Sequence, residues 1–302
     1  MHLAGLLGRR ARYALADSLY RSALERQRRL LGDDHPDVAR TLSGLGLLRQ
    51  QRGDYAGGER LAREALALRR TRLGGAHPDV AVSLVHLANN LQLQGRSAEA
   101  EPLLRQALAL RERLYDGEHV DVAGTMGSLG IVLAQRGAFA EAESLHRAAH
   151  AMRVRLLGPD HPDVHVGAAH LGAVLRRTGR LTEADSIYRA ALAGGVSTLG
   201  PDHPDVMHMV NGLALIARER GQLALSDSLY RAVLATRRRV LGTRHPAVAT
   251  SLHQLGALTA LRGDTAGALV LLRDALSIRR GALGDAHPLT VETTRELARL
   301  GG

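Results

Sequence analysis

HPDVARTLSGLGLLRQQRGDYAGGERLAREALALRRTRLG, residues 35–74, is one copy of a motif that recurs along the chain. Its first histidine returns every 42 residues, at His35, His77, His119, His161, His203, His245 and His287. Proline follows six of these histidines, and valine follows His119. A fixed period of this length predicts an array of repeated supersecondary units.

The residues around each histidine predict the start of a helix. Proline suits the first helical position, where its missing N–H has no intrahelical partner. The acidic residue that follows, Asp37 in this copy, faces the positive end of the helix dipole. Eighteen residues after each of the first six histidines stands a glycine, such as Gly53, and glycine readily takes the left-handed conformation that ends helices. We therefore expect one helix between the histidine and this glycine.

A second amphipathic helix follows in each copy, as in Ala98–Leu114. One such helix hairpin cannot bury both of its faces, whereas stacked copies can. We therefore expect an all-α fold, a solenoid of antiparallel helix pairs. The period divides a single repeat array over 1–302 into a partial unit, six full units and a terminal capping helix: 1–31, then about 32–73, 74–115, 116–157, 158–199, 200–241 and 242–283, then 287–300.

The pattern HPDVA…L..LG…..RG…AE.L.R.AL..R…LG closely resembles the 42-residue tetratricopeptide repeats of kinesin light chains and nephrocystin-3-like proteins. The resemblance covers about residues 3–300. It implies a right-handed superhelix whose first helices line a concave groove for extended peptides, and repeats without enzymatic activity. The Asn-Asn pair common on the first helix of such repeats is missing here, and only Asn211 matches it.

Composition excludes several classes of function. The 302 residues include no cysteine and no lysine, and all 40 basic side chains are arginine. The chain therefore has no P-loop, Schiff-base lysine or protein-kinase ATP site, and no disulfide or thiolate chemistry. No apolar run approaches the length of a membrane span, and the first residues align with a first helix better than with a signal peptide. We expect a cytoplasmic protein without a cofactor or membrane contact, and the heavy use of Ala, Leu, Gly and Arg suggests a high-GC bacterial genome.

Catalytic, metal and nucleic-acid sites are not predicted. The recurrent histidines are interpreted as architectural, because a residue needed once per unit before proline serves the helix start. The pairs His146/His150 and His161/His165 have zinc-ligand spacing, but the first pair falls in tyrosine and leucine columns and His161 lies in a loop. Ser128 lies mid-helix, outside the strand-turn-helix context of a nucleophile elbow. The net charge of +10 is accompanied by only seven aromatic residues for base stacking, so solvated arginines are the preferred interpretation.

The candidate binding surface is the side of the first helices opposite their core face. In the first full unit Val38, Leu42 and Leu45 form the core face by helical spacing. The resemblance implies that the opposite stripe is the concave wall. Its candidate site residues are Arg40, Gln50, Gln92, Arg176, Arg177, His208, Asn211, Arg218, His253 and Gln254. Arginine binds carboxylates through two parallel hydrogen bonds and asparagine can hold a peptide backbone, so we expect an extended peptide of acidic character. The alternative is that these are ordinary solvated polar residues.

The expected function is a non-catalytic protein-interaction scaffold with a protein or peptide ligand. The alternative is the sensory or substrate-docking C-terminal region of a larger bacterial signalling enzyme, because arrays resembling this one are often joined to kinase, NTPase or protease domains. The incomplete first unit favours a chain that is part of a longer protein. Gly194 and Gly195 each cost about 1 kcal/mol relative to alanine inside a helix, so local flexibility is expected there.

Overall fold

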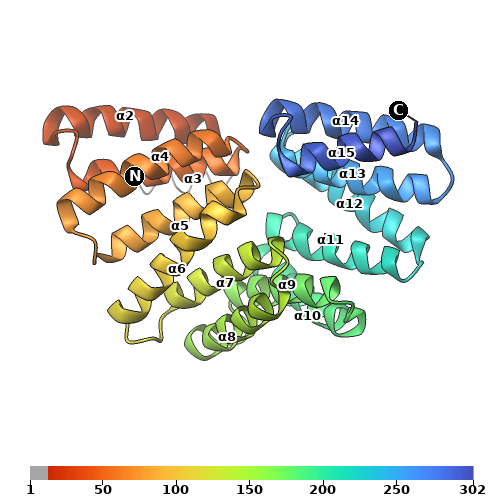
Figure 1. Ribbon diagram of the computed structural model, residues 1–302, viewed down its shortest axis with the longest axis horizontal. Helices are drawn as coiled ribbons and strands as arrows, with labels where there is room; N and C mark the ends of the chain where they lie inside the picture. Colours follow the sequence, from red (N-terminus) through yellow and green to blue (C-terminus); the bar gives the residue numbers. More distant parts are fainter. Residues whose placement is uncertain (1–12, 302) are drawn as a thin grey trace. The chain divides into compact units, whose positions relative to one another are not determined.

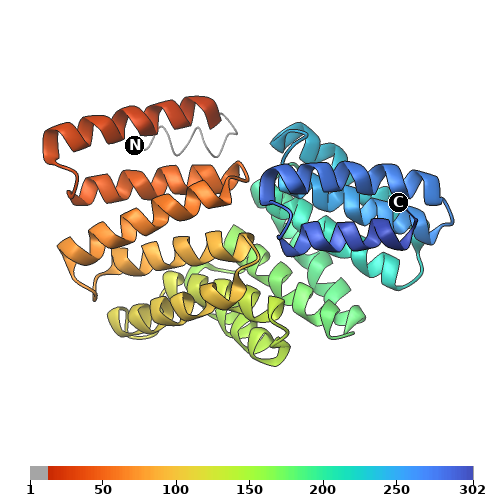
Figure 2. The same ribbon diagram turned by 45° about the horizontal axis from the view of Figure 1, so that its top comes forward.

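The computed structural model describes residues 13–301, which form fourteen α-helices joined by short loops (Figure 1). The first helices of the repeats are α3 (Pro36–Gln51), α5 (Pro78–Leu93), α7 (Val120–Gln135), α9 (Pro162–Arg177), α11 (Pro204–Glu219), α13 (Pro246–Leu261) and α15 (Pro288–Arg299). The second helices are α2 (Tyr13–Leu31), α4 (Tyr55–Leu73), α6 (Ser97–Leu114), α8 (Phe139–Leu157), α10 (Leu181–Leu199), α12 (Leu223–Leu241) and α14 (Thr265–Leu283). The predicted all-α array of sequential antiparallel helix pairs is confirmed (Figure 2). The part of the partial first unit before Tyr13 lies outside the described residues.

Each first helix begins at the recurrent histidine, as predicted. In α3 the N–H of Asp37 donates a 3.1 Å hydrogen bond to Nδ1 of His35. The same bond, from the residue two positions on, occurs at all seven histidines at 3.1–3.3 Å. The imidazole thus satisfies one of the backbone donors that a helix start leaves without a partner. The histidine recurs because every unit needs a side-chain acceptor at this position.

The longer helices end in a left-handed residue, and the one departure from glycine is compensated locally. At the end of α4, Gly74 has φ 77°. Asp116 occupies the equivalent place after α6 with φ 55°, the only positive φ of a non-glycine residue within 13–301. It is followed directly by Gly117 at φ 90°. The chain therefore makes the same turn there with the strain shared between two residues.

The chain divides into two compact parts, called here the first and the second unit, each of which contains several repeats. The first unit is Met1–Arg136 with helices up to α7, and the second unit is Gly137–Gly302 with α8 to α15. In the first unit the predicted core face is confirmed, since Val38, Leu42 and Leu45 are at most 5% exposed. In the second unit one core cluster forms around Tyr188 and another around Tyr230. The Tyr188 ring lies where a Cβ on Gly212 would overlap it, so the glycine of α11 makes room for the tyrosine of α10.

Buried arginines connect each second helix to the next first helix. Arg69 at the end of α4 is 5% exposed, and its NH1 donates to the backbone oxygen of Asp79 and to Oγ of Ser83 on α5. The same pair of bonds, to the residues ten and fourteen positions on, is made by Arg111, Arg237 and Arg279. In α10 this column holds Gly195, and opposite it Met209 replaces the hydroxyl. The two departures occur together, because a methionine cannot accept the hydrogen bonds that a buried arginine requires.

The first helices lie on the inner side of each unit. Contacts join α3 to α5, α5 to α7 and α9 to α11, whereas successive second helices in the described part of the chain make at most weak contacts with each other. Closer spacing on one side curves the stack toward that side.

Candidate functional site

The candidate residues of the first unit lie on two neighbouring first helices. Arg40 on α3 is exposed and pairs with Asp37 at 2.8 Å within the same helix. Gln50 on α3 and Gln92 on α5 are half-buried. The Oε1 atom of Gln50 is buried without a hydrogen-bond partner. Gln50 therefore keeps an unused hydrogen-bond acceptor, while Arg40 is already engaged in an intrahelical ion pair.

Two of the candidate arginines in the second unit are committed to neighbours within that unit. Arg176 at the end of α9 forms an ion pair with Glu219 of α11. The Arg177 guanidinium lies 4.8 Å from the centre of the Phe139 ring, a cation–π contact. Both arginines thus support the stacking of the helices.

Arg218 on α11 differs from these arginines, because it is half-buried and forms no ion pair within residues 13–301. Its charge lowers the pKa of the Glu296 carboxyl, together with Arg299 and His253. Arg218 is therefore the candidate arginine most available to a carboxylate from outside, with one carboxylate of the protein already nearby.

Three candidate residues on α11 and α13 keep polar atoms without partners. The buried atoms without a hydrogen bond include Nε2 of His208, Oδ1 of Asn211 and Oε1 of Gln254. Asn211 is 7% exposed, and burial lowers the pKa of His208 to about 4, with Arg237 adding to the effect. A buried polar group without a partner costs on the order of 1–3 kcal/mol. These three side chains present hydrogen-bonding capacity that the fold itself does not use.

His253 of α13 is held from the next first helix. Its Nδ1 lies 3.3 Å from Oγ1 of Thr293, and its Nε2 lies 3.8 Å from the Glu292 carboxylate. Burial, with the nearby Arg279, lowers the pKa of His253, and the carboxylates of Glu292 and Glu296 oppose this. His253 is therefore fixed in orientation and half-buried beside acidic groups.

Five further histidine positions were not recognised as a group from the sequence. The histidine cluster is the name used here for His146 and His150 on α8, His165 and His170 on α9, and His208 on α11. The charge of Arg153 on α8 acts on His146, His150 and His170. The spacing of the pairs on one helix suggested only zinc binding. Among residues 13–301 no three histidine, cysteine or acidic side chains converge on a metal position. The sequence held one signal for this group, an excess of histidines. Seven of the 15 histidines cap helices, and these five belong to the eight that the repeat does not require.

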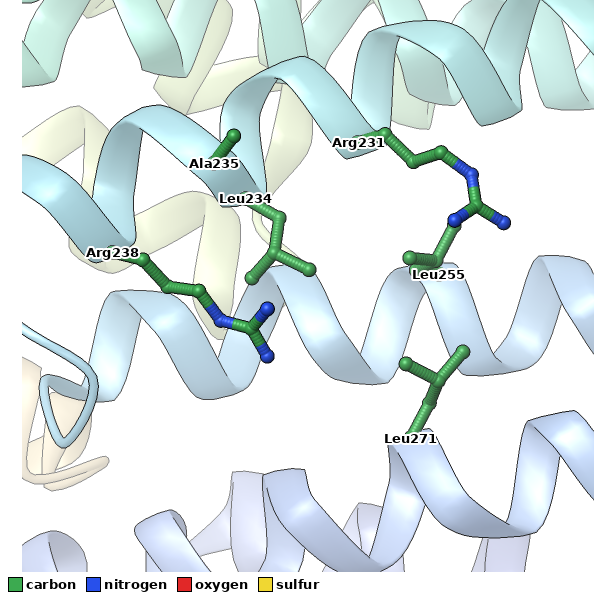
Figure 3. A pocket seen from close by; sticks show the side chains of 6 residues that line it. All are labelled: Arg231, Leu234, Ala235, Arg238, Leu255 and Leu271. Carbon is green, nitrogen blue, oxygen red and sulfur yellow. The ribbon is translucent and has the colours of Figure 1, made fainter.

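The second unit also contains an open slot on the side of the second helices (Figure 3). It has a volume of about 270 Å³ between α12 and α14, over Leu255 of α13. Arg231, Leu234, Ala235, Arg238 and Leu271 complete its lining. Leu234 and Leu255 belong to the core around Tyr230, and Arg231 pairs with Asp227 at 2.7 Å. The slot is thus a gap between two second helices, lined by core leucines and by two arginines.

No helix between Tyr13 and Gly301 combines the length and the apolar character needed to cross a bilayer.

Helix hairpins stacked at a 42-residue period, with a row of polar side chains along the first helices, define a class of helical repeat proteins. One family model described as tetratricopeptide repeat matches residues 1–71, 37–113, 79–153 and 205–281. A second model of the same description matches residues 168–205. The chain therefore belongs to the tetratricopeptide repeat family. No curated protein matches it.

Solved structures of the same fold fall into two groups. The TPR-like repeats of a Podosopora anserina protein described as a kinesin light chain are 24% identical, with a TM-score of 0.53, covering 68% of this chain and 97% of that one. The Rap conjugation gene regulator of plasmid pLS20, in complex with the Phr* peptide, is 17% identical with a TM-score of 0.70, covering 90% and 70%. Apo RapI is 14% identical with a TM-score of 0.68, covering 92% and 96%. The chain is thus structurally similar to kinesin light chain-like repeat proteins and to Rap regulators.

Proposed function

We propose that this chain is a non-catalytic protein-interaction scaffold that binds an extended peptide along the first helices of its second unit. The proposal rests on one observation above all: His208, Asn211 and Gln254 keep buried polar atoms without partners on neighbouring first helices. An extended peptide has an N–H and a C=O at every residue and no internal hydrogen bonds. Its N–H groups match the Oδ1 of Asn211 and the Oε1 of Gln254, which can only accept.

Acidic side chains of the peptide are proposed to approach Arg218. The charge balance makes this a secondary contribution, because Glu219 pairs with Arg176 and Glu296 lies near Arg218. Backbone hydrogen bonding is therefore the main source of affinity in this proposal. The peptide-bound Rap regulator supports the choice of ligand class through its fold alone.

A displayed library of random 12-residue peptides, selected on the wild-type protein, tests the proposal. Selected peptides should bind Asn211→Ala at least about fivefold more weakly, because one hydrogen bond is worth roughly 1 kcal/mol and more when its partner is left buried. Peptides with acidic residues should lose further affinity for Arg218→Glu. Arg231→Ala, in the slot on the opposite side, is the matched control and should bind normally.

Two results would contradict the proposed site. Selected peptides could bind Asn211→Ala and Arg218→Glu as tightly as the wild type. Alternatively, they could lose binding to Arg231→Ala alone, which would move the site to the slot between α12 and α14.

A further inference from the structure

The histidine cluster departs from the repeat at His146, His150 and His165. The equivalents of His150 in the other repeats are leucines, from Leu24 to Leu276. The equivalents of His165 are Ala39, Ala81, Ala123, Met207, Ala249 and Val291. The column of His146 holds Tyr20, Ala62, Leu104, Tyr188, Tyr230 and Leu272. The other repeats thus fold with other side chains at these positions. Packing alone does not require a histidine at any of these three positions.

The five rings come from three helices that stack within the second unit. The His146 and His170 rings are stacked with their centres 5.9 Å apart, and the centre of His208 lies 5.5 Å from that of His170. His165 lies against α10 at Gly194, where a Cβ would overlap the imidazole. A glycine inside a helix costs about 1 kcal/mol relative to alanine, so the fold accepts an unfavourable residue beside His165.

Arg153 supplies a permanent positive charge to the same place. It belongs to the buried arginine column, but the hydroxyl residue of that column is replaced by Gly167. A Cβ on Gly167 would lie 2.5 Å from NH1 of Arg153, so the guanidinium lies directly over this glycine. Its charge lowers the pKa of three rings of the cluster, although burial is the larger cause for each: His146, His150 and His170.

Carboxylates are scarce around the cluster. Asp163 acts on Arg153 and on Asp205, and the group acting on His208 from α12 is the cationic Arg237. The charged groups that act on His146 and His170 are all basic: Arg153 acts on both rings, and His208 and His146 also act on His170. In addition, Nδ1 of His150, Nε2 of His165 and Nε2 of His208 are buried without hydrogen-bond partners. The positive charge of Arg153, together with these unpartnered imidazole nitrogens, complements a negatively charged group with several oxygen atoms.

We propose that the histidine cluster with Arg153 is a binding site for an oxyanion, a carboxylate or a phosphate group. The guanidinium of Arg153 pairs with the anion, and the imidazoles donate hydrogen bonds to its oxygens. One nitrogen of His150 is already hydrogen-bonded to the backbone of Val164, so its other nitrogen donates only when the ring takes up a proton. Anion binding therefore strengthens as the pH falls. The site itself does not depend on the proposed function. Only the identity of the molecule that carries the oxyanion rests on it: an acidic or phosphorylated residue of the bound peptide.

Titration of the whole chain with inorganic phosphate, and separately with acetate, tests the site without any peptide. Two-dimensional NMR of ¹⁵N-labelled imidazoles at pH 6 should show saturable shifts confined to the cluster. One proton taken up with each anion would strengthen binding by up to about tenfold per pH unit between pH 7 and pH 6. Binding of phosphate alone identifies a phosphate site, and binding of acetate identifies a carboxylate site.

Substitutions that copy the residue of another repeat are expected to fold, so a loss of anion binding in them is not a loss of structure. His150→Leu and His165→Ala each restore the residue common in their columns and should weaken binding by about tenfold, the loss of one charge-assisted hydrogen bond. Gly167→Ser places a Cβ where NH1 of Arg153 lies, so it should displace the guanidinium and also weaken binding. His86→Ser is the control, because His86 lies in the first unit with a pKa also lowered to about 4.

The proposal is overturned if neither anion gives saturable shifts, or if all three cluster variants bind as the wild type does. Phosphate binding in a protein that selects no peptide would leave the oxyanion site standing and remove only the proposed peptide function. If peptides are selected but neither anion binds, the peptide function would stand and the oxyanion site would be removed.

Discussion

Replacing His146 by leucine should make the second unit resist acid. The His146 side chain is 2% exposed, and burial lowers its pKa from 6.5 to about 4, with Arg153 adding to the effect. Protonating this ring in the folded protein is therefore less favourable by about 3 kcal/mol than in the unfolded chain. The stability that the neutral ring allows is fully present above pH 6.5 and is lost as the pH falls toward 4. Between pH 7 and pH 5 the loss from this one residue is about 2 kcal/mol.

Urea unfolding followed by circular dichroism at several pH values measures the effect. Leucine occupies the same column as Leu104 and Leu272, which are both fully buried, so His146→Leu keeps the packing. The variant should lose about 2 kcal/mol less stability than the wild type between pH 7 and pH 5. Hydrogen exchange in α8 and α9 assigns the change to this region, because repeat arrays can unfold in parts. Identical pH dependence in the two proteins would refute the reasoning.

Three further predictions concern the architecture. Thr125→Val leaves Arg111 with one buried acceptor fewer and should destabilise the protein by about 1–3 kcal/mol, whereas Thr125→Ser should not; thermal unfolding decides between them. His203→Ala removes a helix cap and should cost about 0.5–2 kcal/mol, and equal unfolding curves for His203→Ala and His203→Asn would contradict the capping role. Gly194→Ala should destabilise the helix by about 1–3 kcal/mol through its overlap with His165, despite the better helix propensity of alanine. Adding His165→Ala should remove that penalty, and a double variant no more stable than Gly194→Ala would count against the overlap.

The period in the sequence was sufficient for the fold and the helix starts. The 42-residue columns predicted where helices begin, and the structure adds that Nδ1 of each histidine is the cap acceptor. The buried arginines were visible as a column, but an arginine in an amphipathic helix is normally exposed and so was interpreted as solvated. Only the stacked structure brings Arg69 to Ser83 on the next helix.

The candidate site was less accessible to sequence reasoning, because its properties depend on side chains from different units. Helical spacing placed Arg176 on the stripe opposite the core face but could not show that Glu219, 43 residues away, pairs with it. In the same way, His146 and His150 were assessed as a pair on one helix, whereas His170 and His208 reach them from two other helices. Spacing along one helix cannot detect a cluster of this kind.

A repeat protein provides its own comparison set, and the departures from its period need to be sorted before they indicate function. Some departures occur as compensating pairs: Gly195 with Met209 replaces an arginine and its hydroxyl, and Gly212 makes room for Tyr188. Such pairs preserve packing and require no ligand. The histidine cluster is different, because Gly194 is the only compensation and it accommodates His165 at a cost in helix propensity. Departures that lower stability without restoring a contact are the ones expected to be retained for binding. By this criterion the histidine cluster, together with the unpartnered polar atoms of Asn211 and Gln254, is the part of the array best suited to function.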